Sequence, residues 1–172
     1  LVGYLPDEPV FFDYLRGREI VEFSGRMFGL DGDQIARRCG RMAERLDMVE
    51  ALGDFAENYS RGMKKKLGLI CALLHRPRLL VLDEPTNLLD PHSTMELHQI
   101  MRDESAAGTA VFFSTHLLDQ AERVCDEIAI LGGGGVVAKG RVAELQSVYE
   151  ESGGLVGMFV RLTTQLAGGG AA

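Results

Sequence analysis

Runs of apolar residues without polar alternation predict strands that are buried on both faces, as in a parallel sheet beneath helices. Residues 79–82, Leu-Leu-Val-Leu, form the clearest run, and similar short segments lie at residues 1–5, 110–113 and 128–131. A glycine turn at residues 132–135, with apolar residues on both sides, predicts a β-hairpin. The pattern therefore predicts a mostly parallel sheet with a C-terminal hairpin.

Between the first two predicted strands, apolar residues recur at helical spacing. Residues 18–52 predict two helices, separated at Gly29-Leu30-Asp31-Gly32. The apolar faces are Ile20, Phe23, Met27 and Phe28 on the first helix and Ile35, Met42, Leu46 and Val49 on the second. We expect these faces to form the core of a small helical lobe, with the docking of a partner as the alternative. Together with helices predicted at residues 61–74, 117–124 and 142–149, the lobe gives an α/β chain.

Two carboxylates and a proline end the run at residues 79–82. Ligands of open α/β sheets gather at the carboxyl ends of the strands, where Asp83 and Glu84 are placed. Successive strand residues point to opposite sides, so one acid can hold a metal while the other faces a water. Asp7 follows the first strand in the same way and can point at a metal or a phosphate-bound water. The alternative for these acids is a solvated turn at the end of a core strand.

Ser60 is a good N-cap for the helix predicted from residue 61 to residue 74. The amino end of a helix attracts anions, and Gly62 lets a phosphate approach the backbone closely. The alternative is an ordinary capped helix. Under either interpretation we expect the three lysines that follow to be mostly solvated: Lys64, Lys65 and Lys66.

Two more polar residues stand next to predicted elements. Asp90 is placed as the N-cap of a helix that begins at Pro91. His116 follows the apolar run at residues 110–113 and can contact a phosphate oxygen or orient an attacking water. A bystander surface histidine is the alternative.

Composition narrows the class of protein. The 172 residues are 46% hydrophobic, enough for the core of one domain or of a domain with an inserted lobe. A net charge of -7 argues against nucleic acid as the main partner. Three scattered cysteines, Cys39, Cys71 and Cys125, favour a reducing, cytoplasmic compartment. The apolar runs are too short to span a bilayer, so we expect any membrane connection to go through a partner. Because the chain begins with Leu1 inside a predicted strand, we expect it to be a fragment whose upstream portion is missing.

Taken in order, Ser60-Arg61-Gly62-Met63, Asp83-Glu84 and His116 resemble the ATP-binding domain of ABC transporters. The similarity covers residues 2–162 and implies a P-loop NTPase-like sheet with an inserted all-helical subdomain. Within this family, the sequence is most similar to exporter ATPases whose signature is Tyr-Ser-(Lys/Arg)-Gly-Met. The resemblance matches residues 3–7 to the Q-loop, 59–63 to the signature motif, 79–83 to the Walker B strand and 87–90 to the D-loop, with Glu84 as the catalytic glutamate and His116 as the switch histidine.

The sequence departs from the family pattern at three places. The P-loop, G-x-x-x-x-G-K-[ST], does not occur in it, so we expect the fragment alone not to bind ATP tightly and to be inactive. Asp7 stands where the family has glutamine, which removes the usual amide contact. Arg61 replaces the first glycine of the common signature, and its charge can help a phosphate site.

The resemblance also implies the activity, cofactors and partners of the intact protein. It implies ATP hydrolysis with Mg²⁺ in a head-to-tail pair of ATPase domains, homodimeric or heterodimeric, coupled to transport by a transmembrane permease. The protein would then be cytoplasmic and peripheral on the cytoplasmic face of the cell membrane. The residues implied are Ser60, Arg61, Gly62, Met63, Asp83 and Asp90 for ATP, Glu84 and His116 for catalysis, and Asp83 and Asp7 for Mg²⁺.

Two other classes share these motifs: a soluble ABC-type ATPase of translation or DNA repair, and a truncated remnant without catalysis that only binds a partner. In all three cases we expect a partial ABC ATPase domain at residues 1–165. It comprises a helical subdomain at about residues 13–76 and an α/β core at residues 1–12 and 77–150. A disordered Gly/Ala tail would follow at residues 166–172.

Overall fold

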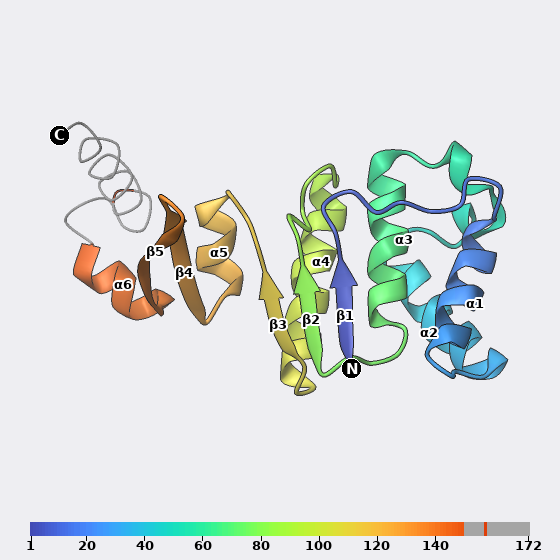
Figure 1. Cartoon of the computed structure of the whole chain (residues 1–172), viewed down its shortest axis with the longest axis horizontal. Helices are drawn as coiled ribbons and strands as arrows, with labels where there is room; N and C mark the ends of the chain where they lie inside the picture. The colour runs from blue at the N-terminus through green and yellow to red at the C-terminus, as the bar shows by residue number, and fades with distance from the viewer. Residues whose placement is uncertain (150–156, 158–172) are drawn as a thin grey trace. The chain divides into compact units, whose positions relative to one another are not determined.

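The computed structural model describes residues 1–149 and residue 157. The chain divides into two compact units, Leu1–Ser114 (unit 1) and Thr115–Ala172 (unit 2). Each unit is described by itself, with its elements labelled in Figure 1. The Gly/Ala tail predicted at residues 166–172 lies outside the described residues. Residues 150–156 and 158–162, at the end of the range that resembles ABC ATPases, also lie outside them.

Unit 1 alternates strands with helices, and every element between its first two strands is helical. In chain order the elements are β1 (Val2–Leu5), α1 (Gly17–Met27), α2 (Gly32–Arg45), the short 3-10 helices η1 (Ala51–Gly53) and η2 (Ala56–Asn58), α3 (Arg61–Leu73), β2 (Leu79–Leu82), α4 (Pro91–Ala106) and β3 (Ala110–Phe113). The strands and the inserted helices agree with the predicted α/β fold.

The three strands of unit 1 form a parallel sheet in the order β1-β2-β3. In register, Leu5 pairs with Leu82, and Leu82 pairs with Phe113. All three strands therefore end at the same edge of the sheet, and the residues that follow them meet there. This arrangement confirms the predicted parallel sheet.

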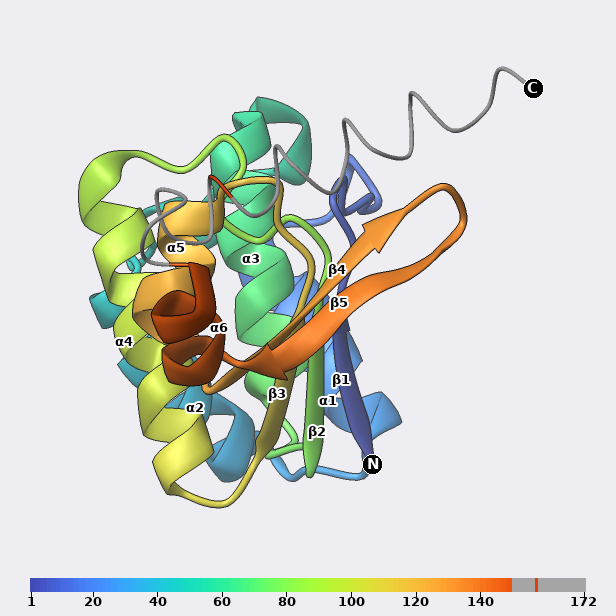
Figure 2. The same cartoon turned by 90° about the vertical axis from the view of Figure 1, so that its left-hand side faces the viewer.

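Among the elements of unit 1, helices cover one face of this sheet. Leu5, Leu80 and Leu82 are at most 1% exposed on that face, beneath α3 and α4, which lie on the same side of the sheet (Figure 2). On the other face Tyr4 is 58% exposed and Phe112 is 65% exposed. The prediction that the apolar strands are buried on both faces is therefore wrong for unit 1, because both helices pack on one side.

The apolar face of α1 is also only partly covered. Ile20 is 7% exposed, as expected for a core residue, but Phe23 is 57% and Met27 is 72% exposed. The buried side of α1 instead carries Val21 and Gly25. A methyl group on Gly25 would lie 2.5 Å from Ile35 of α2 and 3.0 Å from Leu74 at the end of α3, which shows how closely α1 approaches both helices. The predicted core face was therefore wrong for the outer half of this helix.

Unit 2 contains α5 (Leu118–Val124), β4 (Glu127–Gly132), β5 (Gly135–Arg141) and α6 (Val142–Tyr149). β4 and β5 pair antiparallel, so the predicted hairpin is confirmed. The turn uses Gly133 and Gly134, whose φ angles of 58° and 81° favour glycine. Ile130 and Val142 are the buried centre of this unit.

Candidate functional site

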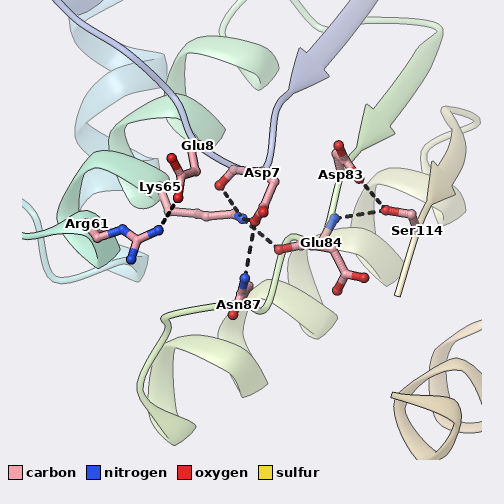
Figure 3. A network of polar contacts seen from close by, with 8 residues as sticks. All are labelled: Asp7, Glu8, Arg61, Lys65, Asp83, Glu84, Asn87 and Ser114. Carbon is pink, nitrogen blue, oxygen red and sulfur yellow. Dashed lines mark hydrogen bonds and ion pairs between the residues drawn. The ribbon is translucent and has the colours of Figure 1, made fainter. Parts of the chain in front are cut away.

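The acid pair Asp83 and Glu84 follows β2 at the carboxyl edge of the unit 1 sheet, as the sequence predicts. Parallel pairing continues on both sides of it, because the Asp83 amide donates to the Leu5 carbonyl (2.8 Å) and the Ser114 amide donates to the Leu82 carbonyl (3.0 Å). The two carboxylates point in different directions (Figure 3). Each acid can therefore act on a different group.

A serine from the neighbouring strand end connects the two acids. The Ser114 hydroxyl donates to Oδ1 of Asp83 (2.6 Å) and accepts the backbone amide of Glu84 (3.0 Å). One hydroxyl thus fixes the Asp83 carboxylate and the backbone of Glu84 relative to each other. Sequence reasoning missed Ser114, although its place directly after the strand at 110–113 is the same signal that marked the acids.

The backbone of Glu84 is held in an uncommon conformation. Its φ angle is 43°, a left-handed value that non-glycine residues rarely adopt and that costs about 1–3 kcal/mol. Its carbonyl accepts the Lys65 ammonium (2.6 Å) and the Asn87 amide (3.1 Å). The Ser114 hydroxyl binds the Glu84 amide, and Lys65 and Asn87 bind the Glu84 carbonyl. The backbone of Glu84 is therefore held on both sides by its surroundings.

Lys65 is buried at the centre of this site. Its side chain is 1% exposed, and its ammonium donates to the Asp7 carbonyl (2.8 Å), to Oδ1 of Asp7 (2.9 Å) and to the Glu84 carbonyl (2.6 Å) (Figure 3). An ammonium has three donors, and all three are used. The prediction that Lys65 is solvated was wrong. A signal was present, because Lys65 shares a helical face with Gly68, Leu69 and Ala72, all of which are buried.

Asp7 stays ionised through its contacts with Lys65 and Asn87. Oδ1 of Asp7 accepts the Lys65 ammonium and also the Asn87 side-chain amide (3.3 Å). The hydrogen bond from Lys65, and then that from Asn87, lower the pKa of the Asp7 carboxyl below its ordinary value of 3.8. The predicted Mg²⁺ role of Asp7 stays a prediction, and one of its two oxygens is already bound to these neighbours.

The amino end of α3 carries the predicted signature residues. The exposed Ser60 is its N-cap and accepts the Met63 amide (3.2 Å). Arg61 forms an ion pair with Glu8, and both side chains are 66% exposed. A methyl group on Gly62 would lie 2.8 Å from the Leu88 carbonyl oxygen, so within this chain the glycine makes room for the loop after β2.

That loop ends at the N-cap of α4, as predicted. Asp90 accepts the Ser93 amide (2.9 Å) and the Ser93 hydroxyl, and the Lys66 ammonium lies 3.6 Å from Oδ2 of Asp90. The Ser93 hydroxyl and then the Ser93 amide lower the pKa of Asp90 well below its usual range. Lys66 is therefore a second lysine of α3 that contacts a loop of the site.

His116 belongs to unit 2, where it precedes α5. Its contact with the nucleotide of this site stays a prediction. The structure of unit 1 therefore brings Asp7 and the Glu84 backbone together on Lys65, with Asp83 next to Glu84 and bound to Ser114. It also places the Ser60–Met63 segment beside the loop at residues 87–90.

A parallel sheet with two acids at its carboxyl edge, beside the capped end of a helix, defines a nucleotide-binding type of α/β protein. A family model described as "AAA domain, putative AbiEii toxin, Type IV TA system" matches residues 17–118. A solved structure described as "Structure of ATP binding subunit of ABC transporter" superposes with a TM-score of 0.86 at 33% identity, covering 94% of this chain and 68% of that one.

Curated relatives agree with this structural match. The chain is 42% identical over 146 residues to YxlF of Bacillus subtilis, named as an uncharacterized ABC transporter ATP-binding protein. It is 33% identical over 166 residues to EcsA of the same organism, an ABC-type transporter ATP-binding protein, covering 96% of this chain and 67% of EcsA. The chain belongs to the ATP-binding proteins of ABC transporters.

The match with YxlF covers 85% of this chain and 49% of YxlF, so the chain spans about half the length of that relative. Among the helices of residues 1–149, none combines the length and the apolar character needed to cross a membrane.

Proposed function

We propose that this chain is part of a subunit that binds and hydrolyses ATP and couples hydrolysis to transport through a membrane permease. The observation that carries the proposal is the acid pair at the end of β2, with Glu84 held by Ser114 on one side and Lys65 on the other. Positioning and charge stabilisation are the main requirements of phosphoryl transfer. A glutamate whose backbone is held on both sides, next to a carboxylate that can bind a metal, meets the first requirement.

Within this proposal the chain contributes to two nucleotides. Glu84 polarises the attacking water on the nucleotide bound by its own chain, and His116 contacts the γ-phosphate of that nucleotide. The Ser60–Met63 segment and Asp90 contact ATP held by a second ATPase domain arranged head to tail. The exposure of Ser60 and Arg61 supports this assignment, because a partner can reach them.

The residues at the sheet edge fit a magnesium ion. Asp83 has a part-buried carboxylate, oriented by the Ser114 hydroxyl, and Asp7 remains ionised nearby. Within the described residues no three His, Cys, Asp or Glu side chains are grouped as a metal site. Mg²⁺ takes one or two protein carboxylates and completes its shell with water and phosphates. When bound, the ion would neutralise charge on the phosphates.

The helical subdomain is proposed to contact the permease. An apolar hollow of about 460 Å³ lies between the loop after β1 and α1, and its lining includes Phe11, Phe12, Phe23 and Met27. Phe12 and Phe23 are each 57% exposed, and exposed apolar surface of this kind marks interaction sites. The protein would then sit on the cytoplasmic face of the membrane. The division into a helical subdomain at about residues 13–76 and a core at residues 1–12 and 77–150 is part of the same proposal.

Replacement of Glu84 tests the proposed chemistry in the full-length protein that carries this chain. Glu84→Gln keeps the shape of the side chain and removes its charge, so we expect ATP binding to remain. Turnover should fall about 10²- to 10⁴-fold, the usual contribution of a group that activates water. The exposed Glu57→Gln is the matched control and should keep full turnover.

Normal turnover in Glu84→Gln would contradict the role of Glu84. No ATP binding in the wild-type full-length protein would instead favour a remnant that only binds a partner. ATP turnover by a full-length protein that copurifies with no membrane partner would favour a soluble ABC-type ATPase.

A further inference from the structure

Arginines line a hollow on unit 1 that is separate from the acid pair. The hollow has a volume of about 430 Å³, and its lining is Gln34, Arg37, Arg38, Arg41 and Arg76. Four of these residues lie on α2, and Arg76 follows the end of α3. Guanidinium groups from two segments of the chain therefore converge on one space.

The charge of these arginines is opposed without a direct ion pair: the negative charge of Asp31 offsets part of the repulsion at Arg38. Within residues 1–149 none of the four arginines forms an ion pair with a carboxylate. By contrast, Arg45 on the same helix pairs with both Glu96 (3.0 Å) and Asp103 (2.9 Å). Among residues 1–149, the acids therefore leave the guanidinium groups of this cluster without a direct carboxylate partner, in a chain whose net charge is -7.

The side chain of Arg38 is held in place by a contact within this chain. Arg38 is half-buried and donates from Nη1 to the Leu74 carbonyl (2.8 Å). Burial, and then the positive charges of Arg76, Arg41 and Arg37, lower the pKa of Arg38. Arg76 has a φ angle of 52°, a conformation that an arginine rarely adopts. An anion bound between these guanidinium groups would relieve their mutual repulsion.

The hollow lies away from the acid pair along β2. Arg76 precedes the amino end of β2, whereas Asp83 and Glu84 follow its carboxyl end. A second hollow of about 660 Å³ shares Arg38, Arg41 and Arg76 but is also lined by Glu104. The carboxylate disfavours a second negative charge there, so the first hollow is the better place for an anion.

We propose that this arginine-lined hollow binds a phosphate-bearing anion. Guanidinium groups are planar and donate two parallel hydrogen bonds to phosphate oxygens, which makes arginine well suited to this ligand. Several phosphates on one small molecule match several guanidinium groups around one space. Such phosphates come either from a soluble polyphosphate or from the headgroup of an anionic lipid, and both present the same oxygens.

Isothermal titration of the full-length protein with myo-inositol hexakisphosphate tests the site, in the presence of saturating ATP and Mg²⁺. The test variant is Arg37→Gln/Arg41→Gln, and the matched control is Arg18→Gln/Arg102→Gln, which removes the same charge from exposed positions on other helices. Hydrogen bonds to charged groups are strong enough that losing each guanidinium should weaken binding about tenfold or more. The control should bind like the wild type.

A second arm distinguishes the two sources of phosphate. Sedimentation is compared between phosphatidylcholine vesicles and the same vesicles with phosphatidylinositol 4-phosphate. Arginine-dependent binding to the soluble probe or to the phosphoinositide vesicles supports the site and identifies the source. Equal binding by the test and control variants, or no binding of either probe, would overturn the proposal.

Arg37→Lys/Arg41→Lys guards against a folding defect in the glutamine variant. It keeps the charge but loses the planar fork, so its affinity should fall between those of the wild type and the glutamine variant. Wild-type affinity in the glutamine variant would contradict the proposal whatever the lysine variant does.

Discussion

At the scale of single residues, Lys65 shows what a buried charge requires. Taking an ammonium out of water is unfavourable unless it is paired and fully hydrogen-bonded. Lys65 meets both conditions, through the Asp7 carboxylate and through the carbonyl oxygens of Asp7 and Glu84. Asp7 is therefore the partner of this lysine, and the two residues should be treated as a pair.

Lys65→Met tests the importance of this pair. The substitution removes the ammonium from the Asp7 carboxylate and from the carbonyl oxygens of Asp7 and Glu84. A lost hydrogen bond to a charged group costs about 1.5–3 kcal/mol of stability. Turnover should fall more than ATP affinity, because the backbone that directs Glu84 loses a contact. Lys65→Arg should restore part of the turnover. Urea unfolding and steady-state kinetics of the full-length protein measure both effects.

Lys64→Met is the control for Lys65→Met. Lys64 is 27% exposed and pairs at 3.4 Å with an exposed acid, Asp13, so its loss should change stability by less than about 0.5 kcal/mol.

The dependence of stability on pH gives a further check of the pair of Lys65 and Asp7. The lowered pKa of Asp7 adds stability above pH 3.8 that is lost as the pH falls through the pKa of the folded state, so wild type and Lys65→Met should converge in acid. A constant difference would contradict the pairing.

At the scale of elements, the contact between α3 and the loop after β2 depends on Gly62. Its missing side chain lets the Leu88 carbonyl come close to the first turn of α3, and Leu88 itself has a φ angle of 67°. The amino end of α3 and the loop that begins α4 are thus fitted to each other. Both carry residues that are proposed to contact the partner's ATP.

Gly62→Ala should displace this loop and lower turnover. The added methyl group would lie 2.8 Å from a backbone oxygen, and the backbone must move to accept it. Gly40→Ala on α2 is the control, because nothing lies within 4 Å of its added methyl group. The control should gain about 0.5–1 kcal/mol of stability, as alanine is the better helix former. Equal turnover in both variants would show that the close contact has no functional importance.

Local patterns predicted most elements, because their causes are local. The run at residues 79–82, the glycine turn of the hairpin, and the caps Ser60 and Asp90 each follow from neighbouring residues. Tertiary packing decided the rest. The burial of Lys65 depends on oxygens that lie far away in the sequence. The exposure of Phe23 depends on how α1 turns toward α3, which no single helix pattern specifies.

At the scale of the whole molecule, the apolar hollow beside α1 is the proposed permease contact. Met27 lines this hollow and is 72% exposed. Met95 on α4 is also 72% exposed but does not line the hollow, so it provides a matched position. Both methionines lie on helices and are equally exposed, so what distinguishes them for this test is whether they line the hollow.

Met27→Asp should therefore weaken copurification with the permease, whereas Met95→Asp should not. A carboxylate in the hollow would have to give up its water when the partner binds, which is strongly unfavourable. Basal ATP turnover of the isolated full-length protein should be unchanged in both variants. Equal recovery of the permease with both variants would place its contact elsewhere.

The face of the unit 1 sheet that α3 and α4 leave uncovered affects how unit 1 behaves in solution. Tyr4 and Phe112 stand on that face, and Val2 beside them is 52% exposed. Contiguous apolar surface of this kind promotes self-association. We therefore expect a sample limited to residues 1–114 to bind hydrophobic dyes and to self-associate more readily in the absence of a mild detergent.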